Sequence, residues 1–515
     1  MKHLPFFLLV CGVLAVSPSI AENAKFGINL SGLEDWSREQ AFLNHMKTAR
    51  KWISQRQGVW DSKDRLSLDE NGYVTQLEPG QWATTLLLTE VTEHFPSGEY
   101  VLLYEGEGGF RWAGNSRHLS SKRGREVVEF TPTGKGFIQL TITEVDPENY
   151  PRNMRFVRKD REELLETQRF SPEFLNRWRE VDTIRFMDWT RTNPSKLSSW
   201  YERPIPDQRT YSHSGAPWEE VIDLCNELKV NAWINIPHRA DDEFIQKTAE
   251  MFRDQLHPSL GVYIEFSNEV WNGMFPASRE SNQRGQEAGL ASEGWRAGAL
   301  QYARDCVRMY EILDKVFTGP QKIRLRKVVA TQASNIGYAK IVVEADGVAE
   351  GADVLAIAPY LTFNVPESPL SWNRDMPIAS EVENWDLDRL FTYLQEISLP
   401  QCSRWMDQQM DLAKKNGLGL TAYEAGQHLT ALGNANRNSK LNELLMRANQ
   451  DPRMGQLYVD YLNHWTKTGG GLICLFNSGQ RYTNAGSWGF FEHWGQTAET
   501  AVKYRAVRQW AAGLR

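Results

Sequence analysis

Eight short apolar runs, each followed by a stretch with helical periodicity, constrain the fold of this chain more than any other feature. Strands that alternate with helices form parallel sheets, because each connecting helix returns the chain to the same edge. Eight such units close most simply into an α/β fold, the (β/α)8 TIM barrel. The runs are FGINLSG (26–32), TIRFMDWT (183–190), VNAWINIPHR (230–239), VYIEFSNE (262–269), VVATQASN (328–335), VLAIAPYL (354–361), LGLTAYEAGQ (418–427) and LICLFNSG (472–479).

Two of the intervening stretches show the helical pattern clearly. They are PWEEVIDLCNELK (217–229) and WMDQQMDLAKKNG (405–417), and the second ends in a glycine suited to a helix C-terminus. A doubly wound open sheet is the alternative, but no GxGxxG motif follows an early strand to favour it. The sequence therefore predicts the barrel.

The pattern changes between about residues 58 and 158, where short β-rich stretches are separated by Gly, Pro and Asn. This predicts an inserted antiparallel β-sandwich-like domain over 58–160, between the first barrel strand and helix (22–57) and the rest of the barrel (161–515). A helix over 37–50 and the run 172–181 would flank the insertion. The inserted domain either binds polysaccharide or braces the barrel, and its few aromatic residues slightly favour bracing.

The first 21 residues have the layout of a secretory signal. Lys2 and His3 precede an apolar run to Val16, and small residues end at Ala21, where cleavage is expected. The run is too short for a membrane anchor, so we expect an exported protein, secreted or periplasmic, without an anchor. A buried N-terminal helix is the alternative interpretation.

Composition excludes some classes of function. Hydrophobic residues make up 41% and charged residues 24%, which is too polar for a membrane bundle, and a net charge of −7 argues against a nucleic-acid partner. The 19 tryptophans exceed what core packing commonly uses, and flat aromatic faces suit sugar rings or other planar ligands.

No metal or cofactor site is predicted. His238 precedes Asp241 and Asp242 but has no second histidine nearby, so a hydrogen-bonding loop is the better interpretation. The four cysteines beyond the signal lie far apart and lack CxxC spacing, which favours buried free thiols and leaves one disulfide open. They are Cys225, Cys306, Cys402 and Cys474.

Two glutamates end the fourth and seventh apolar runs. Catalytic groups of such barrels sit at the carboxyl ends of the strands, and strands four and seven face each other across the barrel mouth. Glu269 and Glu424 would thus flank one groove, as the two carboxyl groups of glycosidic cleavage do. The alternative is that each pairs with a nearby arginine, such as Arg185, in a purely structural role.

The two carboxyl groups are expected to differ in proton affinity. Glu269 precedes Val270 and Trp271, a setting that raises a pKa by desolvation and suits an acid/base. Glu424 would lie close to Tyr360 at the end of the sixth run, and a phenol that donates a hydrogen bond favours an ionised nucleophile.

Asn268-Glu269 after strand four, with Glu424 after strand seven, resembles the clan A glycoside hydrolases, although no specific family is identified. The resemblance implies a retaining double displacement, with Glu269 as acid/base, Glu424 as nucleophile and Asn268 contacting the sugar 2-hydroxyl. It also implies that an arginine on strand two, a histidine after strand three and a tyrosine at strand six support the site. These are Arg185, His238 and Tyr360.

One feature departs from the clan's pattern. Its members commonly carry a tryptophan at the end of strand eight, where this chain has Phe476 and Asn477. Trp488, in the following loop, is the expected replacement. The loop tryptophans are either sugar platforms or plain packing: Trp189, Trp200, Trp218, Trp271 and Trp488.

The sequence as a whole favours an exported retaining glycoside hydrolase that cleaves a β-linked oligo- or polysaccharide. A non-catalytic, cellulose-like carbohydrate-binding protein and a transglycosylase are the alternatives. The predicted catalytic residues are Glu269 and Glu424, and the predicted substrate-binding residues are Asn268, Arg185, His238, Tyr360, Trp271 and Trp488.

Overall fold

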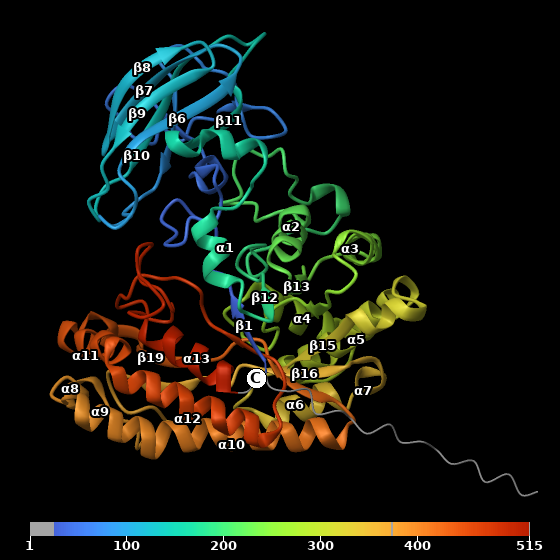
Figure 1. The fold of residues 1–515 in the computed structure, drawn as a ribbon. Coiled ribbons are helices and arrows are strands. Elements are labelled where there is room, and N and C mark those ends of the chain that lie inside the picture. Colours follow the sequence, from blue (N-terminus) through green and yellow to red (C-terminus); the bar gives the residue numbers. More distant parts are fainter. Residues whose placement is uncertain (1–24, 372–373, 514–515) are drawn as a thin grey trace, which may run out of the picture.

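The computed structural model describes residues 25–371 and 374–513, and it contains a closed eight-stranded parallel barrel. The strands follow chain order, which confirms the predicted fold, and all eight predicted runs contribute one strand each (Figure 1). They are β1 (Phe26–Asn29), β12 (Thr183–Arg185), β13 (Asn231–Ile236), β14 (Val262–Phe266), β15 (Leu325–Ala330), β16 (Val354–Ile357), β18 (Gly419–Ala422) and β20 (Ile473–Leu475). The predicted signal peptide, 1–21, lies outside the described residues.

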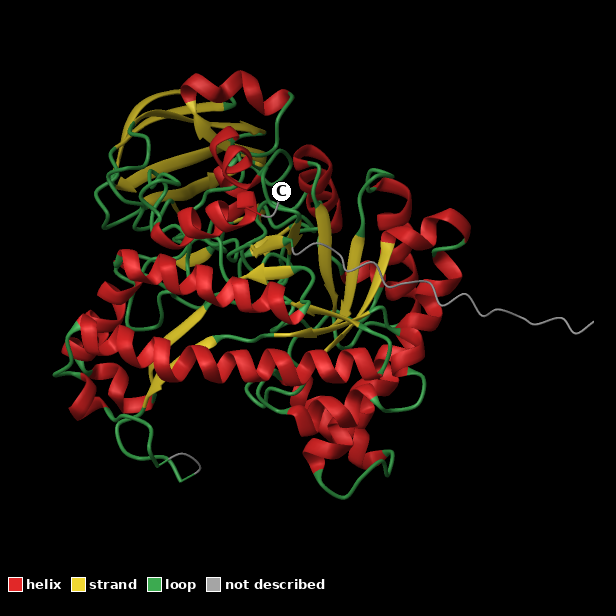
Figure 2. Cartoon of the chain, turned by 60° about the horizontal axis from the view of Figure 1, so that its bottom comes forward, coloured by secondary structure: helices red, strands yellow, loops and turns green. Residues whose placement is uncertain are grey.

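Helices surround the barrel, and the longest ones run along its outside (Figure 2). They bury an apolar stripe against the strands, as amphipathic helices do. The main ones are α1 (Pro172–Trp178), α2 (Trp218–Leu228), α3 (Asp242–Gln255), α4 (Pro276–Glu287), α5 (Gly294–Val316), α6 (Ile336–Val343), α10 (Leu399–Lys415), α11 (Ser439–Gln450), α12 (Pro452–Thr468) and α13 (Val502–Gly513). Among the described residues, no helix is both long and apolar enough to cross a membrane.

Two four-stranded antiparallel sheets are inserted between β1 and β12, and they stand to one side of the barrel (Figure 1). One has the order β2-β5-β10-β7 and the other β11-β6-β9-β8, and they share a separate hydrophobic core. The strands are β2 (Ile53–Gln55), β5 (Trp82–Leu87), β6 (Gly98–Glu105), β7 (Gly108–Gly114), β8 (Ser116–Lys122), β9 (Arg125–Phe130), β10 (Ile138–Val145) and β11 (Arg152–Arg158). A short antiparallel pair, β3 (Ser67–Leu68) and β4 (Val74–Gln76), lies between β2 and β5 in the chain.

The predicted helix over 37–50 is wrong. Only His45–Thr48 is helical, as a short 3₁₀ turn whose N-cap is Asn44. The Asn44 carboxamide oxygen accepts from the backbone N–H groups of Met46 and Phe156, while Phe42 pairs with Phe170 in an isolated bridge. The apolar residues of this segment thus pack in an extended connection between barrel and insertion, and tertiary contacts override the local pattern.

A pair of short strands and a long helix outside the barrel position the groove described below. Strands β17 (Leu361–Val365) and β19 (Gln427–Ala431) pair in parallel just beyond the ends of β16 and β18. Beside them, α9 (Leu387–Tyr393) continues through a π-helical segment, Leu394–Ser398, into α10. π-Helical segments occur often at functional sites.

The interior of the barrel is packed solid. Trp233, Tyr263 and Tyr423 form an inner cluster with Cys474 and small aliphatic residues. All four cysteines beyond the predicted signal are free and buried, as expected from the sequence. A closed interior leaves the loops at the strand ends as the place for a site.

Gly27 on β1 shows how tight this packing is. A Cβ added there would lie 2.6 Å from the carbonyl oxygen of Thr183 and 2.7 Å from the Cys474 sulfur. We expect Gly27→Ala to lower the free energy of unfolding by about 1–3 kcal/mol, through overpacking. Gly32→Ala is the matched control, because no atom lies within 4 Å of its added Cβ. Equal thermal melting of the two variants would contradict this account of the barrel interior.

Candidate active site

The predicted glutamates both follow carboxyl ends of barrel strands. Glu269 lies three residues after β14 and Glu424 two residues after β18. The hydroxyl of Tyr423, the neighbour of Glu424, donates to Glu269 Oε1 at 3.1 Å. The two carboxyl groups also interact electrostatically. The structure therefore brings the two together at one face of the barrel.

Arg185 connects the two strand ends from inside the barrel. Its guanidinium is fully buried and donates to Glu424 Oε1 at 3.0 Å and to Asn268 Oδ1 at 2.7 Å. It also donates to Glu265 Oε2 at 3.0 Å. A buried charge is costly unless it is paired and hydrogen-bonded, and here both conditions are met.

The two glutamates have different environments, while their roles as acid/base and nucleophile stay predictions. Burial raises the pKa of Glu269 to about 8, and the negative charge of Glu424 adds to the effect. The pKa of Glu424 is also raised, because burial outweighs the Arg185 guanidinium and the Tyr360 hydroxyl, which both oppose the rise. Tyr360 donates to Glu424 Oε2 at 3.0 Å. A pKa of about 8 keeps Glu269 protonated near neutral pH.

The backbone before Glu269 is strained. Ser267 and Glu269 have φ angles of 61° and 43°, in the left-handed region that residues with a Cβ rarely adopt. The Asn272 amide holds the carboxyl group by donating to Glu269 Oε2 at 2.9 Å. This sharp turn ends the strand and directs the Glu269 side chain to the groove.

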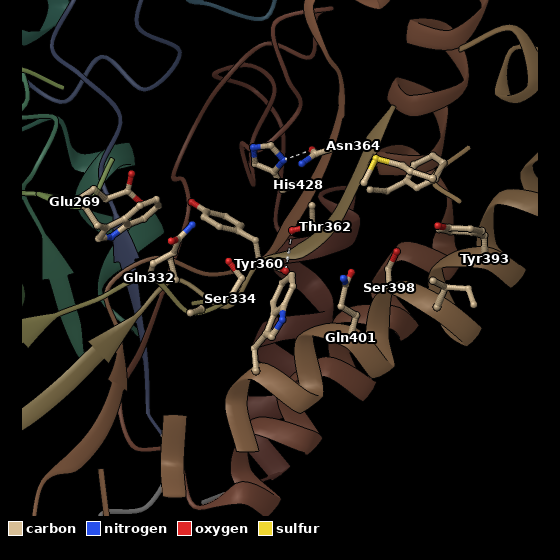
Figure 3. Close-up of a pocket in the computed structure, with 17 residues that line it drawn as sticks. Glu269, Gln332, Ser334, Tyr360, Thr362, Asn364, Tyr393, Ser398, Gln401 and His428 are labelled. Atoms are coloured by element: carbon tan, nitrogen blue, oxygen red, sulfur yellow. Dashed lines mark hydrogen bonds between the residues drawn. The ribbon is translucent and has the colours of Figure 1, made fainter. Parts of the chain in front are cut away.

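A groove of about 660 Å³ begins at Glu269 and extends outward from the barrel. In Figure 3 Glu269 stands at one end and Tyr393 at the other, with Tyr360 between them. Its remaining lining is aromatic, aliphatic or carries uncharged amide and hydroxyl groups: Trp271, Gln332, Ala333, Ser334, Ala358, Thr362, Phe363, Asn364, Met376, Ile397, Ser398, Gln401, Trp405 and His428. Its size and lining are those of a small-molecule or saccharide site.

The other predicted binding residues fall into two groups. Trp271 and Tyr360 line the groove, and Asn268 lies beneath it, only 2% exposed, with its amide donating to Asn193 Oδ1 at 3.0 Å. Trp488 does not line the groove; its ring packs behind His428.

His238 is not among the residues that line the groove. Its Nε2 lies 3.2 Å from a carboxylate oxygen of Glu280 on α4. Burial lowers its pKa, so the ring is neutral near pH 7. Among the other loop tryptophans, Trp189 and Trp218 are buried in the main core and pack rather than line the groove.

Two acidic residues at the site were missed from the sequence. Glu265 on β14 is fully buried and accepts from Arg185 and from Trp233 Nε1, the latter at 2.8 Å. A carboxylate inside an apolar run is itself a signal, because it needs a buried partner. Asp188, after β12, lies within electrostatic range of Glu424, and burial raises its pKa to about 7. Its own sequence context gave no such signal.

The described part of the chain gathers no group of three or more His, Cys, Asp or Glu side chains that could hold a metal ion. Burial raises the pKa of the cysteine thiols, as for Cys474 at the barrel centre. The absence of a cofactor stays a prediction from the sequence.

No family model matches this sequence, and no curated protein matches it. Several solved structures resemble it at low identity. A GH51 arabinofuranosidase from Xanthomonas axonopodis pv. citri shares 13% identity over 61% of each chain, with a TM-score of 0.37, so the match spans about three fifths of that enzyme. A GH5 family lichenase from Caldicellulosiruptor sp. F32 shares 12% over 66% of this chain and 83% of its own, with a TM-score of 0.40. A GH5-4 broad specificity endoglucanase from Clostridium longisporum shares 10% over 69% and 90%, with a TM-score of 0.38.

The electrostatic coupling between the glutamates is testable by titration. We expect Glu424→Gln to lower the pKa of Glu269 from about 8, because a neighbouring negative charge is lost, while burial keeps it above 4.5. Carbon-13 NMR of the glutamate carboxyl groups measures this value. Glu344→Gln, at an exposed pair with Lys415, is the control and should leave it unchanged. An unchanged pKa in Glu424→Gln would show that the two groups do not face each other.

Proposed function

We propose that the protein is an exported retaining glycoside hydrolase that cleaves a β-linked oligo- or polysaccharide. The observation that carries this proposal is the pair Glu269 and Glu424, two coupled carboxyl groups at strand ends with unequal hydrogen-bond partners. Glycosidases need one carboxyl group that is protonated and another that is ionised near the scissile bond.

In the first step the Glu424 carboxylate attacks the anomeric carbon, and the bond to the leaving oxygen breaks as Glu269 donates its proton to that oxygen. The product is a covalent glycosyl-enzyme and a free alcohol. Arg185 and Tyr360 keep Glu424 ionised and oriented through hydrogen bonds of 3.0 Å each. In the second step Glu269 takes a proton from water, and the water oxygen displaces Glu424 from the anomeric carbon.

The groove supports a neutral saccharide as substrate. Among its described lining residues, Glu269 and His428 are the two whose side chains commonly titrate below pH 9, and burial lowers the pKa of His428. Within residues 25–371 and 374–513, no lysine or arginine lines the groove to neutralise a uronate or a sulfate ester. Its aromatic and amide groups match the apolar faces and hydroxyls of uncharged sugars.

Export rests on the N-terminal pattern over 1–21 alone. A carbohydrate-binding protein without turnover and a transglycosylase remain the competing functions. The binding protein has no need for a proton donor beside a carboxylate, whereas the transglycosylase shares the same covalent intermediate.

Substitution of the two glutamates tests the mechanism. On whichever aryl or natural β-glycoside the wild type hydrolyses, we expect Glu269→Gln to lower kcat by about 10²- to 10⁴-fold for poor leaving groups. Glu424→Gln should lower kcat by about 10³-fold or more for any leaving group, because the nucleophile is gone. Glu344→Gln is again the surface control.

Azide distinguishes the two roles. Added azide should restore turnover in Glu424→Ala and give a glycosyl azide of inverted configuration, since azide replaces the enzyme's nucleophile directly. In Glu269→Ala it should give the retained configuration, through the glycosyl-enzyme. Activity that survives in both glutamine variants would refute the proposed mechanism.

The outer groove tests whether the substrate is a chain. Tyr393, Ile397, Ser398, Gln401 and Trp405 present one face of the helix that carries the π-helical segment. We expect Trp405→Ala to lower kcat/KM for oligosaccharides about tenfold or more, because apolar contact with a sugar ring is lost. Hydrolysis of an aryl glycoside with a single sugar should change far less.

Trp295→Ala is the matched control, because this tryptophan is 53% exposed and lies outside the groove. Equal losses for short and long substrates in Trp405→Ala would show that the outer groove does not hold a second sugar.

A further inference from the structure

A second cavity, of about 610 Å³, lies between the inserted β-rich region and the loop that connects β12 to α2. One wall comes from residues 51–72 and the other from residues 208–213. The two walls are tied together, since the Arg209 backbone N–H donates to the Asn71 carbonyl at 2.9 Å and Thr210 Oγ1 donates to the Ala49 carbonyl at 2.6 Å. The volume falls in the range of about 300–1,000 Å³ typical of ligand sites.

Arg209 lines this cavity and is the unusual residue in its wall. Its side chain is only 2% exposed, and it packs over the Trp52 ring at 4.4 Å. Nη2 donates to the Arg50 carbonyl at 2.9 Å, but Nε and Nη1 have no acceptor within residues 25–371 and 374–513. No carboxylate in that part of the chain forms an ion pair with it. A buried guanidinium is costly without a counter-charge, so an anion from outside would stabilise it.

The cost of burying the Arg209 guanidinium is reflected in its pKa. Burial lowers the pKa of Arg209 to about 9, and among the described residues only Tyr73, a phenol that is uncharged near neutral pH, opposes this shift. Arg185, in contrast, is equally buried but paired with two carboxylates, which raise its pKa. The two buried arginines thus differ in whether the protein itself supplies the anion.

Arg209 gives the wall its excess of positive charge. Four acidic residues line the cavity, but Asp61 pairs with Lys63 and Asp64 pairs with Arg56, while Asp69 accepts from the Tyr150 hydroxyl and from backbone N–H groups. Lys51 and Arg65 also line the cavity and form no ion pair in the described part of the chain, so their charges balance those of Asp69 and Glu70.

We propose that this cavity is a second binding site, separate from the groove at Glu269, and that it takes an anionic ligand whose carboxylate or sulfate group is held by Arg209, Lys51 and Arg65. Hydroxyl and amide groups on the same walls, from Ser54, Thr210, Asn71 and Gln208, suit the remaining polar part of such a ligand. An acidic saccharide and a free inorganic anion share this recognition chemistry. The groove at Glu269 has no lysine or arginine among its described lining residues and would not hold either.

Binding measurements on the purified protein test the proposal without reference to activity. The probes are trigalacturonate, the neutral galactotriose and inorganic sulfate, titrated by calorimetry at constant ionic strength. We expect saturable binding of an anionic probe and at least about tenfold weaker binding of galactotriose, because charge-assisted hydrogen bonds are absent. Trigalacturonate that binds more tightly than sulfate identifies an acidic saccharide as the ligand, and the reverse identifies a free anion.

Variants of the lining residues show whether the anion binds in this cavity. Arg209→Gln should weaken anion binding about tenfold or more, and Lys51→Gln should weaken it severalfold. Lys51 is exposed, so its variant remains informative if Arg209→Gln fails to fold. Arg117→Gln, at an exposed pair with Glu129 on the inserted sheets, is the matched control.

Failure of both anionic probes to bind would overturn the proposal. So would binding that is equal in the wild type, Lys51→Gln and Arg117→Gln. Because none of these residues contacts the glutamate pair, glycoside hydrolysis and anion binding can fail independently.

Discussion

The guanidinium of Arg185 is the interaction on which the candidate site depends. It lies inside the barrel on β12 and bonds to Asn29 on β1, Glu265 on β14 and Glu424 after β18, so it joins strands that are distant in the chain. In a packed interior this charge is tolerated only because carboxylates and amide oxygens surround it. Its positive charge in turn opposes the rise that burial causes in the pKa of Glu265 and of Glu424.

The same bonds create the difference between the two glutamates. Glu424 lies against Arg185 and Tyr360, whereas within the described residues the hydrogen-bond partners of Glu269 are the Asn272 amide and the Tyr423 hydroxyl. Burial raises the pKa of both, and the charge of Arg185 opposes the rise at both, but Arg185 donates a hydrogen bond only to Glu424 of the two. The packing of the strand ends and the proposed assignment of acid and nucleophile therefore depend on the same buried guanidinium.

The sequence predicted the barrel and the glutamate pair, but it did not predict all of the residues around them. Eight apolar runs, seven of them after the insertion and 26 to 66 residues apart from start to start, leave few arrangements other than a closed parallel sheet. The expected helix over 37–50 failed because Phe42 and Asn44 make contacts with residues more than a hundred positions away. His238 and Trp488 likewise contact Glu280 and His428, and no local sequence pattern predicts these contacts.

The sequence by itself determined the features that follow from its periodicity. These are the strands, their order, and which acidic residues lie at the strand ends. A residue at such an end must face the barrel mouth, because the interior is filled. Only the tertiary structure decided which charges meet. It paired Arg185 with Glu265 and Glu424 and left Arg209 without a carboxylate, because ion pairing depends on distances of a few ångströms between side chains that the chain brings together only on folding.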